Sequence, residues 1–212
     1  MDKTHSGDGT TIAFDRLGAG TPVVLVSGAS TARSIHGQLA ELLAADFTVF
    51  NYDRRGRGDS GDTPPHSVQR EVEDLQAVLA AAGGSAAVFG NSSGAVLALR
   101  AAAAGLPVTR LALWEPPFRT DPDAPRRQRE YVAQLTRLLD EGRRGDAMAL
   151  FMTSIGLPEA MIAGMRQARR CGRAWRRWPP PSSTTPPSWA TAWCRPAWSP
   201  PSMRPPSSWT AA

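Results

Sequence analysis

One serine in this sequence has neighbours that could turn its hydroxyl into a nucleophile. Ser92 is the central residue of Gly-Asn-Ser-Ser-Gly at 90–94, a G-x-S-x-G pattern. The apolar run at 86–89 is typical of a buried strand, and the run at 95–101 consists of helix formers. A side chain at so sharp a strand-to-helix corner is pushed outward. At the helix N-terminus, Ser92 would have the N–H of Ser93 beside it, pointing to where a developing oxyanion would sit.

Small residues are needed around this corner and at a second loop. Gly90 and Gly94 remove the Cβ atoms that would collide where the strand turns into the helix. The β-branched run at 22–26 predicts a buried parallel strand, and it ends in Ser-Gly-Ala-Ser at 27–30. Together these patterns resemble the nucleophile elbow and the oxyanion loop of the α/β-hydrolase superfamily.

The resemblance extends over residues 10–156 and implies a mechanism. It assigns Ser92 as the nucleophile and the N–H groups of Ala29 and Ser93 as the oxyanion donors, with Gly28 allowing close approach of the backbone. Where the family usually has His-Gly, this chain has Ser-Gly. The family resemblance implies a small ester or related acyl substrate, no cofactor and no metal.

Elements that would position these residues alternate along the chain. Strands are expected at 10–15, 22–26, 47–52, 86–89 and 108–114, with helices at 35–45, 68–82 and 95–101 between them. This alternation predicts an α/β protein with a doubly wound, mostly parallel sheet, and the first strand is expected at its edge. The loop at 53–60 resembles the D-x-R-G-x-G-x-S loop of the same superfamily, and we interpret it as structural: its Asp and Arg side chains can tie neighbouring loops together.

The expected order of a catalytic triad is nucleophile, acid and then histidine, yet His5, His36 and His66 all precede Ser92. We interpret His5 as part of a mobile terminus, His36 as the start of a helix and His66 as part of a polar loop, all at the surface. Glu115 follows the strand at 108–114, where some hydrolases keep their acid, but without a histidine it orients nothing. The chain is therefore predicted to be an impaired hydrolase.

The composition changes sharply near the C-terminus. All 19 acidic residues lie at or before Glu159, whereas six of the seven tryptophans and ten of the 19 prolines follow Arg170. We predict a core at 1–123, the start of a helical cap at 124–168, and an irregular or disordered tail at 169–212. Tryptophan and serine codons become aliphatic codons when such GC-rich DNA is read one base out of frame, and a strand-like PTLVLDG can then be written. We hypothesise a frameshift near Ala168 that removes the acid and the histidine.

Other classes of protein are favoured less by the sequence. The strand and glycine turn at 23–30 are also similar to those of short-chain dehydrogenases, but the later glycines and a Tyr-x-x-x-Lys pair are missing, since Lys3 is the only lysine. A phosphate loop at 53–60 lacks the G-K-[ST] ending. A basic tail that binds nucleic acid through Arg and Trp is the third alternative. The polar N-terminus and the short apolar runs predict a soluble, cytoplasmic protein without membrane or nucleic-acid partners.

Overall fold

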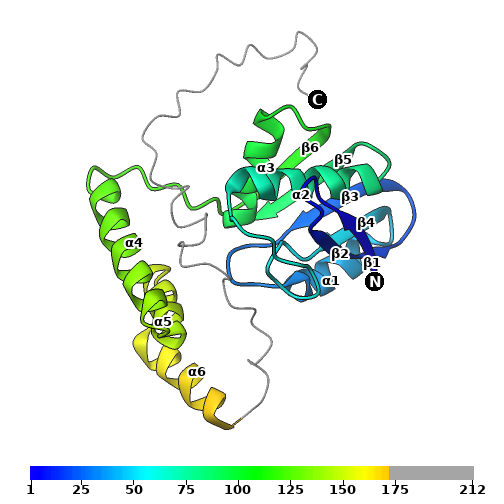
Figure 1. Ribbon diagram of the computed structural model, residues 1–212. Helices are drawn as coiled ribbons and strands as arrows, with labels where there is room; N and C mark the ends of the chain where they lie inside the picture. Colours follow the sequence, from blue (N-terminus) through cyan, green and yellow to red (C-terminus); the bar gives the residue numbers. More distant parts are fainter. Residues whose placement is uncertain (172–212) are drawn as a thin grey trace.

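The computed structural model describes the backbone of residues 1–171 and the burial of side chains up to Arg166. Within this range six strands form one mixed sheet in the order β1-β2-β4-β3-β5-β6 (Figure 1). The pairs β1·β2 and β2·β4 are antiparallel, while β4·β3, β3·β5 and β5·β6 are parallel. The strands are β1 (Asp2–His5), β2 (Thr11–Leu17), β3 (Thr21–Val26), β4 (Phe47–Tyr52), β5 (Ala86–Asn91) and β6 (Val108–Trp114).

Helices cover both faces of the sheet, as a doubly wound fold requires. Apolar side chains of α2 and α3 pack on one face, in a cluster with Val24, Tyr52 and Val88, and α1 packs on the other face over Val23, Leu25 and Val49. The alternation of buried side chains along β3 explains why one short strand serves two cores. The helices are the 3-10 turn η1 (Arg33–His36), α1 (Gly37–Leu43), α2 (Val68–Ala81), α3 (Ser93–Ala103), α4 (Ala124–Asp140), α5 (Arg144–Ser154) and α6 (Glu159–Cys171).

The sheet contains one strand that the sequence did not predict. The strand β1 pairs with β2, so that β2 lies inside the sheet and the expectation of an edge strand there was wrong. His5 is likewise part of β1, opposite Thr11, and not of a mobile terminus. Both differences have one cause: β1 is short, polar and largely exposed, and it carries no apolar alternation that a pattern could detect.

Three helices lie to the side of the sheet domain. Helix α4, which lies beside α5 in Figure 1, begins at Ala124, the residue at which the cap was predicted to start. The side chains of Leu135, Leu138 and Ala147 join α4 to α5. Helix α6 was not expected, and it continues to Cys171, past the predicted tail boundary at residue 169. The remainder of the predicted tail, with the proposed change of reading frame, lies outside the described residues. No helix in the described range is long and apolar enough to span a membrane.

Candidate active site

The turn between β5 and α3 holds Ser92 in an unusual backbone conformation. Its φ of 53° and ψ of −122° are outside the regions that most residues with a side chain adopt. The Ser92 N–H donates to the carbonyl of Trp114 at 2.8 Å, which ties the turn to the end of β6. The side chain is half-buried and does not cap α3. The strand, strained turn and helix predicted around Ser92 are therefore present, and the hydroxyl is not used to satisfy the N–H groups of the helix.

The two glycines of the pattern are required by close backbone contacts. A Cβ on Gly94 would lie 2.2 Å from the Val26 carbonyl oxygen and 2.6 Å from that of Ser27, so α3 touches the end of β3 at this point. A Cβ on Gly90 would lie 2.6 Å from the carbonyl oxygen of Gly94 and 2.7 Å from the Ala95 Cα. Neither position has room for a side chain, because the obstructing atoms belong to the backbone.

The loop after β3 lies directly beside the serine. A Cβ on Gly28 would lie 3.3 Å from the Cβ of Ser92 and 2.8 Å from the amide oxygen of Asn91. Parallel pairing of β3 with β5 causes this proximity, because the C-terminal ends of both strands meet at one edge of the sheet. Among the backbone–backbone hydrogen bonds outside the helices and strands of the described residues, none uses the N–H of Ala29 or of Ser93.

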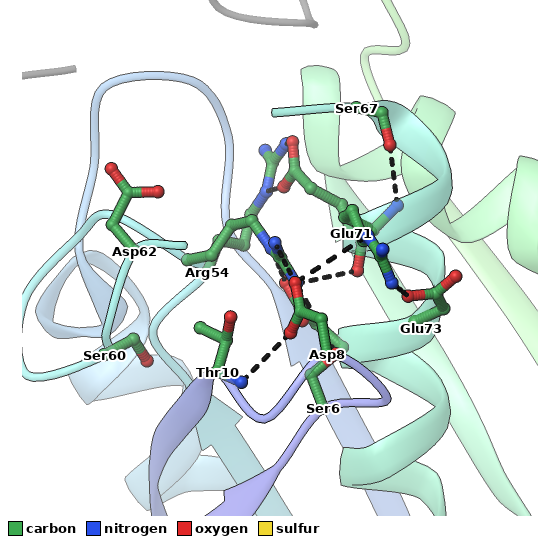
Figure 2. A network of polar contacts seen from close by, with 12 residues as sticks. Ser6, Asp8, Thr10, Arg54, Ser60, Asp62, Ser67, Glu71 and Glu73 are labelled. Atoms are coloured by element: carbon green, nitrogen blue, oxygen red, sulfur yellow. Dashed lines mark hydrogen bonds and ion pairs between the residues drawn. The ribbon is translucent and has the colours of Figure 1, made fainter. Parts of the chain in front are cut away.

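A buried arginine connects the two loops that flank the serine. Arg54 Nη1 donates to the Ser27 carbonyl oxygen at 3.1 Å and to the Ser93 hydroxyl at 3.0 Å. Its Nε and Nη2 donate to the two carboxylate oxygens of Glu71 in α2, at 2.6 and 2.8 Å (Figure 2). Such a fork of hydrogen bonds fixes both distance and orientation. The loop after β3 and the start of α3 are thereby held to one side chain.

Glu71 is ionised because of this contact. Burial alone would raise the pKa of its carboxyl, but the charge and the hydrogen bonds of Arg54 outweigh burial and lower the pKa. For Arg54, burial disfavours the cation, and Glu71 more than compensates, so its pKa is raised. The pair therefore stays charged at neutral pH although both side chains are almost fully buried.

The structural interpretation of the loop at 53–60 is supported by its contacts. Buried Asp53 accepts hydrogen bonds from the backbone N–H groups of Arg33, at 2.6 Å, and Asp59, at 2.9 Å, and from the Arg33 guanidinium. A Cβ on Gly58, whose φ is +53°, would collide with the Asp53 carboxylate, so only glycine fits there. Arg55 binds Asp74 and Asp8, and Asp8 is labelled in the network of Figure 2. The loop thus ties β2, η1 and α2 together.

Comparison with known proteins decides the family. A profile described as the alpha/beta hydrolase family matches residues 23–210. The chain belongs to the alpha/beta hydrolase family. An alpha/beta hydrolase from Sphaerobacter thermophilus DSM 20745, solved by crystallography, is 51% identical, and the match covers 90% of this chain and 69% of that one with a TM-score of 0.71. The short-chain dehydrogenase alternative is therefore not supported.

Two curated relatives match a part of this alpha/beta hydrolase chain. N-formylmaleamate deformylase of Pseudomonas putida is 35% identical over 144 residues, which are 63% of this chain and 52% of that protein. A relative from Azorhizobium caulinodans, whose name describes a carbamate hydrolase, is 35% identical over 106 residues, 49% of this chain and 40% of that protein. The chain thus spans about half the length of these two relatives, or less.

The three histidines lie on other elements than Ser92, and no contact in the described range joins any of them to it. His36 is buried, which corrects the expectation of a surface position: its ring meets Phe89 edge-on at 5.6 Å, and its Nδ1 has no partner in the described part of the chain. Burial lowers its pKa. His66 is also partly buried, and its Nε2 pairs with Asp62 at 2.6 Å.

Glu115 follows β6, close to the turn that holds Ser92. Its φ of 46° is unusual for a residue with a side chain, and its side chain is exposed. The preceding residue, Trp114, provides the carbonyl that holds the N–H of Ser92. The strained residue Glu115 therefore directly follows the residue whose carbonyl binds the Ser92 N–H. This connection was not visible in the sequence.

Proposed function

We propose that the chain is a serine hydrolase of small acyl substrates, with Ser92 as the nucleophile. The observation that carries the proposal is the strained position of Ser92 between β5 and α3, with a side chain that is not engaged in capping the helix. Two relatives point to the substrate class, since a carbamate and an N-formyl amide both present an acyl carbon bonded to a heteroatom. An ester or amide of this kind, small enough for a half-buried serine, fits the site best.

The chemistry follows from the groups around Ser92. The hydroxyl oxygen attacks the acyl carbon, its proton passes to a base, and the carbonyl π electrons move onto the oxygen. The N–H groups of Ala29 and Ser93 stabilise this oxyanion, and Gly28 lets the backbone approach it. Collapse of the tetrahedral intermediate expels the leaving group and leaves an acyl-serine, which water then hydrolyses. No step needs a cofactor or a metal.

The same proposal includes an impairment. The chain has no histidine after Ser92, and the three histidines that it has are engaged elsewhere or lie on β1. Without a base to accept the serine proton, only the contribution of the oxyanion donors and of substrate binding is left. We therefore expect slow acylation of Ser92 and little or no turnover.

Chemical rescue tests both parts of the proposal. The protein is incubated with p-nitrophenyl acetate, with and without imidazole as an external base, and the acylated peptide is identified by mass spectrometry. We expect an acetyl group on the peptide that contains Ser92, formed faster with imidazole and absent in Ser92→Ala. The matched control Ser34→Ala, at an exposed serine, should behave as the unaltered chain does.

Each half of the proposal can fail separately. Acetylation that persists in Ser92→Ala, or that never reaches residue 92 even with imidazole, would refute the assignment of the nucleophile. Rapid turnover without imidazole that disappears in Ser92→Ala would instead refute the impairment and leave the nucleophile in place.

A further inference from the structure

The peptide bond between Gly28 and Ala29 is held from its carbonyl side. The Gly28 carbonyl oxygen accepts a hydrogen bond from Arg57 Nη1 at 2.7 Å and a longer one from Thr31 Oγ1 at 3.2 Å. This peptide is trans, so its C=O and N–H vectors point in opposite directions within one plane. Fixing the direction of the Gly28 carbonyl therefore fixes the direction in which the Ala29 N–H points.

Arg57 is half-buried, and the backbone from which its side chain reaches Gly28 is held by two hydrogen bonds. Its backbone N–H donates to the Arg54 carbonyl oxygen at 3.1 Å, and its own carbonyl oxygen accepts from the Ser60 N–H at 3.0 Å. Burial, together with repulsion from the Arg54 guanidinium, lowers the pKa of Arg57 to about 9, and the group therefore still carries its proton at neutral pH. A hydrogen bond from a charged donor is roughly twice as strong as one between neutral groups.

We propose that Arg57 is a positioning residue that aims the Ala29 N–H at the oxyanion, with the Thr31 hydroxyl as a weaker second contact on the same carbonyl. The inference rests on the proposed function, because it assigns a role within the same site. A cation on the carbonyl also polarises the peptide, which makes its N–H a better donor. Arg54 and Arg57, three residues apart on one loop, thus hold both sides of the proposed oxyanion site. Arg54 binds Ser27 and Ser93, and Arg57 binds Gly28.

The test must separate aiming of the N–H from general stability. Acylation of Ser92 is measured in imidazole buffer with a p-nitrophenyl ester and with its thiono analogue, in which sulfur replaces the carbonyl oxygen. Sulfur is the poorer hydrogen-bond acceptor, so the ratio of the two rates reports on the oxyanion donors and not on the amount of folded protein. For Arg57→Met we expect the ester rate to fall about 10- to 100-fold, a loss no larger than that caused by deleting one oxyanion donor. The thiono rate should change much less, so the ratio falls.

Two further variants complete the experiment. Arg70→Met removes a partly exposed guanidinium that binds Glu73 and lies near Asp8, away from Gly28, and should leave the ratio unchanged. Thr31→Val removes the second hydrogen bond with almost no change in shape, and should lower the ratio in the same direction by a smaller factor. Thermal unfolding followed by circular dichroism shows which variants fold. If Arg57→Met does not fold, Thr31→Val decides the question.

The outcomes distinguish this inference from the proposal on which it rests. An unchanged ester-to-thionoester ratio in folded Arg57→Met, or in Thr31→Val if Arg57→Met is unfolded, overturns the positioning role. Absence of Ser92 acylation in the unaltered protein refutes the hydrolase proposal itself, and the positioning role falls with it. A ratio that falls in Arg57→Met and holds in Arg70→Met supports both.

Discussion

The buried Arg54–Glu71 pair allows the sharpest prediction about stability. Replacing Arg54 with Met removes four hydrogen bonds and leaves the Glu71 carboxylate buried without its cation. Breaking a buried ion pair from one side typically costs about 3–5 kcal/mol. Because domains of this size are stable by only about 5–15 kcal/mol, we expect Arg54→Met to lose a large fraction of the free energy of unfolding.

We expect the double variant, Arg54→Met with Glu71→Leu, to have a free energy of unfolding no lower than that of either single variant. Glu71→Leu leaves the Arg54 cation buried and should also cost about 3–5 kcal/mol. In Arg54→Met with Glu71→Leu, no charge is left unpaired, and the remaining loss is the missing donor at the Ser27 carbonyl and the Ser93 hydroxyl, about 2–4 kcal/mol together. The two single effects should therefore be strongly non-additive.

Urea denaturation followed by far-ultraviolet circular dichroism measures the cycle. The exposed pair Arg126–Glu130 in α4, with an N–O distance of 3.1 Å, serves as the control, and its coupling should be at most about 0.5 kcal/mol. If the Arg54 and Glu71 effects simply add, the carboxylate is not dependent on Arg54 for its charge, and the reasoning about the pair is wrong.

Two other predictions concern packing and pH. Gly94→Ala places a Cβ 2.2 Å from the Val26 carbonyl oxygen and should destabilise by about 1–3 kcal/mol or more; Gly164→Ala in α6, with nothing within 4 Å, should be neutral or stabilising by up to about 1 kcal/mol in the same urea titration. Since burial lowers the pKa of His36, the unfolded chain binds a proton more readily than the folded one below about pH 6.5. The free energy of unfolding should therefore decrease as the pH is lowered through this range. His36→Leu should flatten that part of the pH–stability curve. An equally steep loss in His36→Leu would exclude His36 as its source.

Elements with a strong local pattern could be predicted from the sequence. The strands β3, β4 and β5 are short apolar runs, and α2 carries an acidic residue in its first turn, so their existence followed from their own residues. The strand β1 was missed because its side chains are polar and exposed, and only its partner β2 makes it a strand. Pairing of this kind is not encoded within the strand itself.

The side-chain contacts of the site are non-local, which is why the sequence could not reveal them. Arg54 meets Ser93 across 39 positions, and Arg57 meets Gly28 across 29. The order of the parallel strands predicts that their C-terminal loops meet, but not which atoms meet. The D-x-R-G-x-G-x-S pattern indicated that charged side chains tie loops together, and the structure shows the carbonyls and the hydroxyl that they reach.

The arrangement of these contacts separates two parts of the proposed active site. In the described part of the chain, the contacts that shape the surroundings of Ser92 lie between residues 26 and 114: the turn at 90–94, the loop after β3, the two arginines and the Trp114 carbonyl. The family order puts the histidine after the nucleophile, and no histidine follows Ser92 here. The geometry around Ser92 therefore does not depend on a catalytic histidine. An external base should then restore chemistry without any refolding, because the parts that it would serve are already in place.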